Sequence, residues 1–489
     1  WQRMGAMTTQ SVNPRTKESF GPNFADDSAS VIDAAVTAAV NSFSDWSSSA
    51  PTIRAAALYA VADELDSNID SLVEIADLET GLGHPRLIGE VGRTTFQIRQ
   101  FASAISRGDF VAPFVDAAVD SPLPFGHPEL VRSFSAVGPV VVFGSSNFPF
   151  AFSVLGGDTA SALAAGCTVI AKAHPAHPQT SQKVFELASS KLPVGVLALV
   201  HGFEAGKSLL ADPRITAGAF TGSRGGGRAL FDLANLRETP IPFYGELGSV
   251  NPVVELEGGA PDAILFATAY LDSLLLGNGQ FCTNPAILFL PEGSATLSEI
   301  KSQITQREGG IFLSEATKSL HDKNRALLES LVVGEIFTGK DSLIPGFTSA
   351  PQVFIAPLKN LNRTALSIEA FGPTGLILTY TDVDQLMATL RTMEGALTSS
   401  IFSAADNPEL IRVTKALATM SGRVSFNTWP TGVAVTAGQN HGGPYPASTT
   451  PLHTSVGLSA ITRFLRPITF QSFPKKIQNS ILNNVERIE

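Results

Sequence analysis

The run Val137-Gly-Pro-Val-Val-Val-Phe-Gly-Ser-Ser-Asn147 contains a short, uninterrupted apolar segment that stops at glycine and small polar residues. Similar apolar runs follow it and alternate with segments of helical periodicity. The apolar runs cover residues 168–172, 196–200 and 217–220, and the helical segments cover 180–190 and 228–236. Continuous apolar strands that alternate with helices are typical of a parallel sheet covered on both faces. The sequence therefore predicts an α/β fold with a doubly wound sheet.

Polar residues stand where these predicted strands end. Ligands of such sheets bind at the carboxyl ends of the strands. Asn147 can donate an amide hydrogen to an oxyanion, although asparagine is also common in turns. Lys172 is either solvated or aimed at ribose hydroxyls. The turn from Gly222 and Ser223 to Gly227 opens a helix and presents backbone N–H groups to a phosphate, but it is not a GxGxxG motif and is a weak signal alone.

The flanking parts of the chain predict further domains. Helical patterns dominate the first hundred residues, and a second alternating region follows the first sheet. The helical patterns cover 34–43, 53–65, 69–78 and 90–105, and the strand patterns of the second region cover 285–289, 352–355 and 375–380. Residues 110–129 suggest a loop or hairpin, and 463–471 an edge strand that pairs with another subunit. A chain of 489 residues exceeds one hydrophobic core.

Composition excludes several classes of function. The net charge is −10 and no lysine or arginine run forms a nucleic-acid patch. The most apolar long stretch, 151–171, is interrupted by three glycines and an aspartate, so we expect no membrane span. Cys167 and Cys282 have neither a disulfide framework nor metal-ligand spacing, so we expect no metal and a reducing, cytoplasmic location.

The segment Gly277-Asn-Gly-Gln-Phe-Cys-Thr-Asn284 carries one of the two cysteines. Its glycines allow a close approach of the backbone to a ligand, and a nucleophilic thiol there can direct its own N–H at an oxyanion. The alternative is a buried structural thiol. No histidine is near Cys282 in sequence. Glu246, which lies between glycines at the end of an apolar run, is either a general base for water or a solvated loop residue.

Five motifs, in order, resemble those of the aldehyde dehydrogenase superfamily, and the resemblance covers nearly the whole chain. The motifs are Ser146-Asn-Phe-Pro149, Phe220-Thr-Gly-Ser223, Tyr244-Gly-Glu-Leu-Gly-Ser-Val-Asn-Pro252, Gly277-Asn-Gly-Gln-Phe-Cys-Thr283 and Glu369-Ala-Phe-Gly-Pro373. The resemblance implies two doubly wound parallel-sheet domains and a small β oligomerisation element. These are expected at 1–110 with 136–247 for the cofactor, 248–462 for catalysis, and 111–135 with 463–489 for assembly into a homodimer or homotetramer.

The resemblance also implies a mechanism. Cys282 attacks the aldehyde carbon, while the Asn147 side chain and the Cys282 N–H hold the oxyanion. The thiohemiacetal then gives hydride to the nicotinamide, and Glu246 activates the water that hydrolyses the thioester. The implied cofactor contacts are Lys172 and Glu369 on ribose hydroxyls, Phe371 near the nicotinamide ribose, and Ser223 with Gly222 and Gly227 at the pyrophosphate turn. Cys167 matches no functional position and is expected in the core.

One departure from the family pattern concerns the cofactor. NAD-preferring members commonly have a glutamate three residues after the strand-ending lysine, where this chain has Pro175. Without that carboxylate a 2′-phosphate is not repelled, so we expect NADP, with NAD possible. Lys207 is a candidate phosphate partner or simply an exposed lysine.

Other departures concern the substrate. Ser146, the segment 443–449 and the tail Arg463-Phe-Leu-Arg-Pro467 resemble a branch of 2,5-dioxovalerate (α-ketoglutarate semialdehyde) dehydrogenases, which also includes bacterial fatty-aldehyde enzymes. We therefore expect oxidation of 2,5-dioxovalerate to 2-oxoglutarate. The alternatives are a medium- or long-chain fatty aldehyde, a CoA-acylating dehydrogenase, against which Glu246 argues, or a non-catalytic binding protein.

A carboxylated aldehyde needs a cation at the mouth of its pocket. Arg93 shares one helix face with Gly89 and Gln97, and the resemblance puts this face beside the substrate tunnel, where a guanidinium suits a carboxylate. The alternative is a surface salt bridge with Glu90 or Glu79. Apolar walls of the pocket are expected from Phe148, Phe152 and Phe281, which can equally be core residues.

Overall fold

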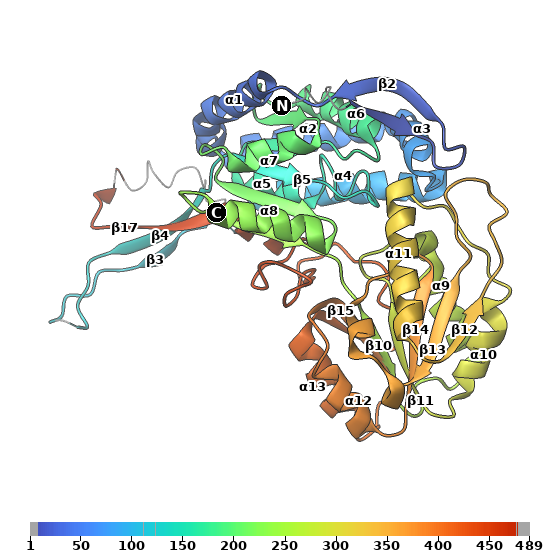
Figure 1. Cartoon of the computed structure of the whole chain (residues 1–489). Coiled ribbons are helices and arrows are strands. Elements are labelled where there is room, and N and C mark those ends of the chain that lie inside the picture. Colours follow the sequence, from blue (N-terminus) through green and yellow to red (C-terminus); the bar gives the residue numbers. More distant parts are fainter. Residues whose placement is uncertain (1–7, 111, 123, 476, 478–489) are drawn as a thin grey trace.

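Two sheets, each with helices on both faces, form two lobes in the computed structural model (Figure 1), which describes residues 8–110, 112–122, 124–475 and 477. The first sheet is parallel and has the strand order β7-β6-β5-β8-β9. Its strands are β5 (Val140–Phe143), β6 (Val169–Lys172), β7 (Leu197–Val200), β8 (Ala217–Thr221) and β9 (Phe243–Glu246). The predicted apolar runs thus form neighbouring strands of one sheet.

Side chains of the first sheet alternate between two hydrophobic clusters. Val140 and Val142 pack in one cluster, and Val141 and Phe143 in the other. Burying a valine contributes about 1.5–3 kcal/mol, so both faces need a cover. The first face packs against α2 (Pro51–Ser67), α3 (Ile69–Thr80), α4 (His84–Ser106), α5 (Gly157–Ala165) and α6 (Pro178–Ser189), and the second against α1 (Ala29–Ser48), α7 (Phe203–Ala211) and α8 (Arg224–Leu236).

The second lobe repeats this plan. Its sheet has the order β12-β13-β14-β11-β10-β15-β16 and is parallel except for the edge strand β12. The strands are β10 (Pro252–Glu255), β11 (Ile287–Pro291), β12 (Glu335–Thr338), β13 (Gln352–Pro357), β14 (Thr374–Tyr380), β15 (Ala396–Phe402) and β16 (Ser421–Phe426). One face packs against α9 (Ala263–Leu275) and α10 (Ala295–Ile304), and the other against α11 (Glu315–Leu331), α12 (Val383–Leu390) and α13 (Leu410–Met420). The α/β prediction with two doubly wound sheets is confirmed.

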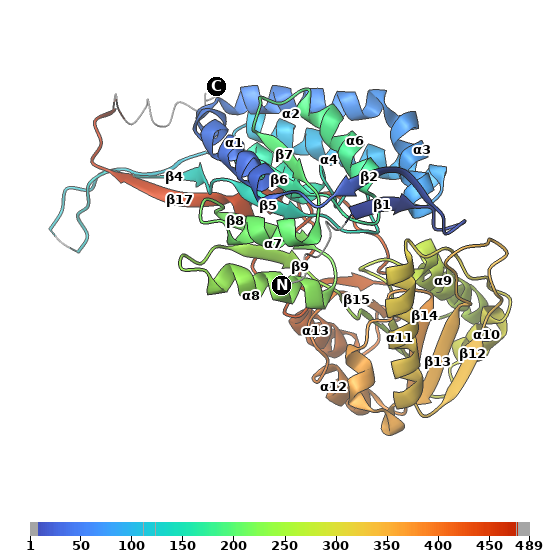
Figure 2. The same ribbon diagram turned by 45° about the horizontal axis from the view of Figure 1, so that its top comes forward.

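A third sheet protrudes from the first lobe as an arm (Figures 1 and 2). It has the antiparallel order β17-β4-β3, with β3 (Phe114–Asp116), β4 (Leu130–Ala136) and β17 (Leu465–Gln471). The C-terminal strand lies at the edge of this sheet, as expected, and pairs on its other side with β4 of the 111–135 excursion. Its pairing with another subunit stays a prediction. Of the predicted assembly segment 463–489, residues 476 and 478–489 lie outside the described residues.

An N-terminal hairpin went unpredicted. β1 (Thr8–Val12) and β2 (Ser19–Ala25) are antiparallel, and side chains of the hairpin are mostly exposed, so no apolar run marks them. The buried carboxylate of Glu79 fixes the hairpin to α6, because it accepts hydrogen bonds from the Ser11 hydroxyl and from the backbone N–H groups of Gln179 and Thr180. Glu79 therefore does not pair with Arg93.

A buried ion pair joins the end of the chain to the first lobe. The Arg463 guanidinium lies 2.7 Å from the Asp158 carboxylate, and the Arg463 side chain is 3% exposed. Arg463 belongs to the 3₁₀ helix η4 (Leu458–Phe464), whereas Asp158 lies on α5. Removing one member of such a pair leaves an uncompensated buried charge, so this pair holds η4 against α5.

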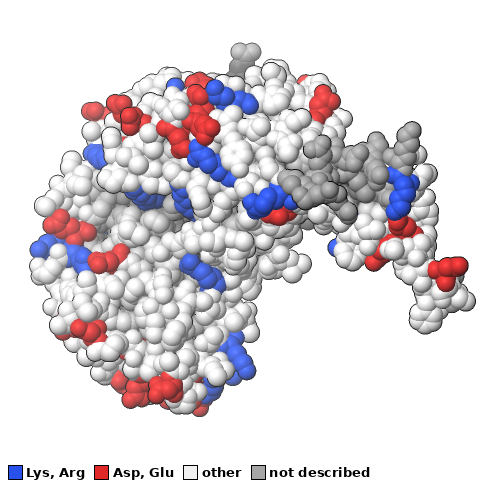
Figure 3. Space-filling view, turned by 180° about the vertical axis from the view of Figure 1, so that it is seen from behind, with Lys and Arg blue, Asp and Glu red and all other residues white. Residues whose placement is uncertain are grey.

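Surface charges are mixed. Lysine and arginine are interspersed with aspartate and glutamate over the face shown in Figure 3. Within the described residues, no helix is both long and apolar enough for a membrane crossing.

Candidate active site

The carboxyl end of the first sheet faces a turn of the second lobe. Lys172 and Glu246 are the last residues of β6 and β9, and Asn147 follows β5. Cys282 lies between the 3₁₀ helix η1 (Leu276–Gly279) and β11. All four residues line one cavity of about 890 Å³, to which both lobes contribute.

Hydrogen bonds within the second lobe hold the Cys282 loop. The Asn251 side chain donates to the Cys282 carbonyl at 2.9 Å and to the Asn284 carbonyl at 3.0 Å. Gln280 donates to the carbonyl of Ile311 at 2.9 Å. Gly279 has φ +70°, and a Cβ there would lie 2.1 Å from the Gly372 carbonyl oxygen. Gly279, one of the glycines that we expected to allow a close approach to a ligand, and the amide side chains therefore shape the loop itself.

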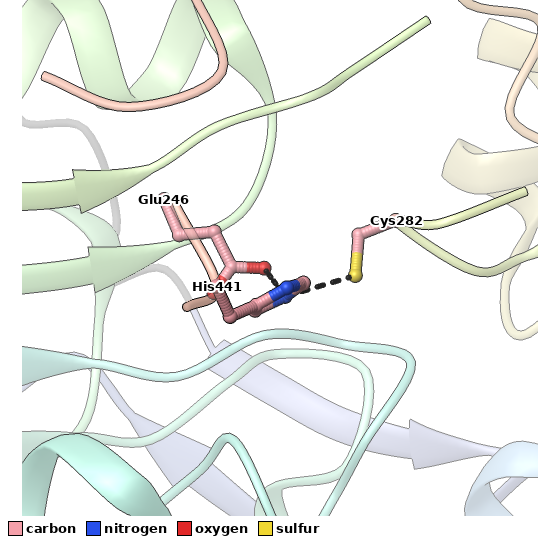
Figure 4. Close-up of side chains that lie close together, drawn as sticks. All are labelled: Glu246, Cys282 and His441. Atoms are coloured by element: carbon pink, nitrogen blue, oxygen red, sulfur yellow. Dashed lines mark hydrogen bonds and ion pairs between the residues drawn. The ribbon is translucent and has the colours of Figure 1, made fainter. Parts of the chain in front are cut away.

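His441, which the sequence analysis missed, completes the group around the thiol (Figure 4). Its Nε2 lies 2.8 Å from Glu246 Oε1 and 3.6 Å from Cys282 Sγ. The Ser455 hydroxyl donates to Glu246 Oε2 at 2.5 Å. His441 is 159 positions from Cys282 along the chain, and only its place in the glycine-rich Asn440-His-Gly-Gly-Pro444 was a signal.

Burial and charge set the protonation of this group. Burial raises the pKa of the Cys282 thiol well above its ordinary value, and the Glu246 carboxylate raises it further. Burial alone also raises the pKa of Glu246, but the His441 imidazole and the Ser455 hydroxyl outweigh it, so the Glu246 pKa lies below its ordinary value. In this arrangement the carboxylate is ionised and the thiol keeps its proton, so a nucleophile here needs a base.

Two donors converge beside the thiol. The Asn147 side chain is buried and donates to the Gln280 carbonyl at 3.0 Å. The Cys282 N–H has no partner among the described residues. An amide and a backbone N–H next to a nucleophile form a pocket for an oxyanion.

Helix α4 fixes the segment that carries Asn147. The Arg86 guanidinium donates to the Asn147 carbonyl at 2.7 Å, and its carbon lies 5.0 Å from the Phe148 ring centroid and 4.8 Å from that of Phe281. One turn further on, Glu90 Oε1 accepts the backbone N–H groups of residues 150 and 151 at 2.8 and 3.0 Å. Both sides of the oxyanion pocket therefore contact one arginine.

The predicted substrate residues form one cluster. The rings of Phe152 and Phe281 each lie 5.3 Å from that of Phe148. The Arg93 guanidinium lies 5.1 Å from the Phe152 ring centroid and 5.9 Å from that of Phe148. Arg93 makes no ion pair with any residue in the described ranges, which excludes the expected alternative of a salt bridge with Glu90 or Glu79. Its half-buried charge faces Glu90, Cys282 and Glu246.

The cavity fits a nicotinamide dinucleotide. Its lining includes Lys172, Gly222, Ser223, Glu369 and Phe371, together with Ser145, whose buried hydroxyl has no described hydrogen-bond partner. Ser223 caps the N-terminus of α8, where a pyrophosphate is favoured. The sixth residue of the predicted set, Gly227, does not line the cavity. It is buried where a Cβ would lie 2.1 Å from Leu247 Cδ2, so it allows close packing of α8.

Two half-buried ionisable groups line this cavity. Burial lowers the pKa of Lys172 to about 8, against the opposing effect of Asp26. Burial raises the pKa of Glu369 to about 7, against a hydrogen bond from the Ser249 N–H. Both groups are thus poorly solvated, and ribose hydroxyls would supply the hydrogen bonds that water otherwise provides.

Pro175 and Lys207 line the end of the cavity near Lys172. Lys207 also pairs with Glu204 at 2.8 Å on the same helix, and both side chains are exposed. A lysine in a surface pair of this kind is held weakly, so Lys207 is free to turn toward an anion in the cavity.

Two parallel-sheet lobes that share a dinucleotide-sized cavity define a nicotinamide-dependent dehydrogenase of the α/β class. Residues 1–450 match the model of the aldehyde dehydrogenase family. Over 436 residues the chain is 42% identical to alpha-ketoglutaric semialdehyde dehydrogenase 2 of Azospirillum brasilense, covering 86% of this chain and 83% of that protein. Over 500 aligned positions it is 35% identical to an alpha-ketoglutaric semialdehyde dehydrogenase of Acinetobacter baylyi, covering 98% and 93%.

A solved structure of 1-pyrroline-5-carboxylate dehydrogenase from Thermus with bound NAD shares the fold, with a TM-score of 0.81 and 22% identity over 95% of this chain and 90% of that one. The chain belongs to the aldehyde dehydrogenase family and is an NAD(P)-dependent aldehyde dehydrogenase. The family resemblance seen in the sequence is confirmed.

The Glu246→Gln variant should make the Cys282 thiol easier to ionise. A neighbouring carboxylate disfavours a thiolate, so removing its charge lowers the thiol pKa. The rate of iodoacetamide alkylation, followed by peptide mass spectrometry against pH, should show its midpoint shifted to lower pH. Cys167 is the internal control, because burial raises its pKa to about 11. An unchanged midpoint would mean that Glu246 does not act on the thiol.

The Arg86→Met variant should lower kcat about tenfold, a fraction of what the loss of one oxyanion donor costs, with little change in KM. If Arg86 acts by positioning Asn147, the same change in an Asn147→Ala background should cost almost nothing further. Arg99→Met is the matched control, since Arg99 lies on the same helix and pairs with Asp63 and Asp66 instead. If the losses in kcat from Arg86→Met and Asn147→Ala were fully additive, Arg86 would not act by positioning Asn147.

Proposed function

We propose that this enzyme oxidises 2,5-dioxovalerate to 2-oxoglutarate with NADP. The observation that carries the proposal is Arg93, a half-buried guanidinium without an ion-pair partner in the described ranges, beside Phe148 and Phe152 and within electrostatic reach of Cys282. A cation at that position suits the carboxylate of a short oxo acid. Two relatives named alpha-ketoglutaric semialdehyde dehydrogenases, at 42% and 35% identity, support this choice.

The first step is the activation of Cys282. The Glu246 carboxylate is ionised and forms a hydrogen bond with the Cys282 thiol, so it accepts the thiol proton as the sulfur attacks the aldehyde carbon and then releases it to solvent through the cavity. His441 Nε2 lies 2.8 Å from Glu246 Oε1 and donates its hydrogen to the carboxylate, which holds it in place beside the thiol. The three groups thus act as a nucleophile, a base and a hydrogen-bond donor that orients the base.

The oxyanion of the thiohemiacetal is held by the Cys282 N–H and by the Asn147 amide, which exchanges its bond to the Gln280 carbonyl for one to the substrate. Arg86 keeps the Asn147 backbone in place. Asn251, through its bond to the Cys282 carbonyl, keeps the peptide of the nucleophile oriented.

A bound nicotinamide supplies the hydride acceptor in this chemistry. Lys172 and Glu369 would hold ribose hydroxyls, Phe371 would pack beside the nicotinamide ribose, and Ser223 with Gly222 would face the pyrophosphate. These assignments rest on the places of the five residues in the cavity lining.

Hydrolysis of the thioester needs an activated water. Glu246 is ionised and lines the same cavity as Cys282, so it can accept a proton from a water that attacks the acyl carbon. The protonated Glu246, which forms a direct hydrogen bond with the Cys282 side chain, then returns the proton to the departing sulfur. One carboxylate–imidazole pair thereby acts in both halves of the reaction.

The three-stranded arm is the part of the chain that we assign to assembly with a second copy. Phe114, Val115 and Phe125 of the arm are 59%, 46% and 76% exposed. An apolar, protruding β-element of this kind is expected to be covered in a homodimer or homotetramer. The division into cofactor, catalytic and assembly segments follows from the same assignment.

The substrate test compares kcat/KM for 2,5-dioxovalerate and hexanal in the native enzyme and in Arg93→Ala. The native enzyme should prefer the dioxovalerate. The variant should lose at least about tenfold for it, since a hydrogen bond to a charged group contributes about 1.5–3 kcal/mol, with under about twofold loss for hexanal. Arg99→Ala serves as control. Equal losses for both aldehydes would remove the carboxylate role, and a preference for hexanal would favour a fatty-aldehyde enzyme.

The cofactor test introduces a carboxylate at position 175, which is a proline in this chain. Pro175→Glu should lower kcat/KM for NADP at least about tenfold, because the carboxylate repels the 2′-phosphate, and should keep or improve the value for NAD. Pro175→Gln controls for the loss of proline without adding charge. A native enzyme as efficient with NAD as with NADP would contradict the preference.

A further inference from the structure

The group in Figure 4 has a second property: its three side chains form a set of metal ligands. Cys282 Sγ, His441 Nε2 and a Glu246 carboxylate oxygen all lie within 4.8 Å of one another. Among the described residues, no other set of three or more histidine, cysteine, aspartate or glutamate side chains brings its ligand atoms this close together. Thiolate, imidazole and carboxylate are the ligands that Zn²⁺ takes in proteins.

The spacing of these atoms fits tetrahedral zinc. Bond lengths of about 2.3 Å to sulfur and about 2.0–2.1 Å to nitrogen, at a tetrahedral angle, put the two ligand atoms about 3.5 Å apart. Cys282 Sγ and His441 Nε2 are 3.6 Å apart. The nitrogen and Glu246 Oε1 are 2.8 Å apart and would need to separate to about 3.4 Å. A small rotation of the glutamate side chain provides that movement.

The surroundings also suit a metal. The Ser455 hydroxyl donates to the second oxygen of Glu246, which is the outer support that orients a carboxylate ligand. Glu246 and Cys282 line the cavity, so an ion can reach them from the cofactor side. Three protein ligands leave a fourth position for water, as in open zinc sites.

We infer that Cys282, His441 and Glu246 form a zinc site, and that Zn²⁺ inhibits the enzyme by binding there. Binding converts the thiol to a zinc thiolate and releases its proton to solvent, with no change of oxidation state. The sulfur is then no longer free to attack an aldehyde, and the Glu246 carboxylate is no longer free to act as a base. The inhibitory effect rests on the proposed role of Cys282, but the binding itself does not.

The test therefore measures binding without turnover. Co²⁺, which takes the same tetrahedral sites as Zn²⁺, should give the native enzyme a thiolate charge-transfer band and intense visible absorption at one equivalent, and Zn²⁺ should abolish both. Cys282→Ser should lose the charge-transfer band. His441→Ala and Glu246→Gln should each weaken Zn²⁺ binding at least about tenfold, since even outer-shell changes cost tenfold or more. NADPH binding by fluorescence verifies that each variant is folded.

Cys167→Ser is the matched control and should bind Co²⁺ and Zn²⁺ as the native enzyme does, because Cys167 is buried in the core. In assays, Zn²⁺ should inhibit competitively with the aldehyde, and EDTA should restore activity. A band that survives Cys282→Ser would overturn the site, as would undiminished Zn²⁺ affinity in both His441→Ala and Glu246→Gln. If Co²⁺ binds as described but no aldehyde is oxidised, the zinc site stands and the proposed function fails.

Discussion

The hydrogen bond between Glu246 and His441 is the contact on which the rest of the site depends. It joins the last residue of a strand in the first lobe to a loop that follows the final strand of the second. Both side chains are almost fully buried, at 3% and 2% exposure, so water screens their interaction little, and the imidazole lowers the pKa of the Glu246 carboxyl. The Cys282 thiol lies next to this pair, with its sulfur 3.6 Å from His441 Nε2. A cavity shared by two lobes thus has its chemistry fixed by one contact between them.

Helix α4 positions the residues that surround this contact. Its successive turns present Arg86 to the Asn147 backbone, Glu90 to the N–H groups that follow, and Arg93 to the phenylalanine cluster. These residues stand one turn apart on one helix, so the Asn147 segment and the phenylalanine cluster keep a fixed spacing. This explains why charged residues stand on the buried face of a helix where apolar ones would pack more easily.

The sequence predicted the features that depend on residues close together along the chain. Apolar runs marked the strands of both sheets, and the ends of β5, β6 and β9 marked Asn147, Lys172 and Glu246, since the carboxyl end of each strand follows from the pattern alone. It did not predict His441, because a contact across 159 positions leaves no periodicity. The N-terminal hairpin was missed for a related reason: Ser11 and Glu79 hold it by polar contacts. Gly227 lies next to the predicted cofactor turn, but its lack of a side chain allows close packing of α8 against Leu247.

The ion pair of Arg463 with Asp158 has a consequence for biosynthesis. Phe464 and Ile461 belong to the same hydrophobic cluster as Leu58 and Val140, and β17 completes the sheet begun by β4. The first lobe therefore contains segments that the ribosome makes after the second lobe. Whereas separate domains fold in order of synthesis, this lobe stays incomplete until the second has emerged. A nascent chain released early would lack part of the core of the first lobe and would expose apolar residues there. Cellular quality control would then recognise the whole chain as one incompletely folded unit.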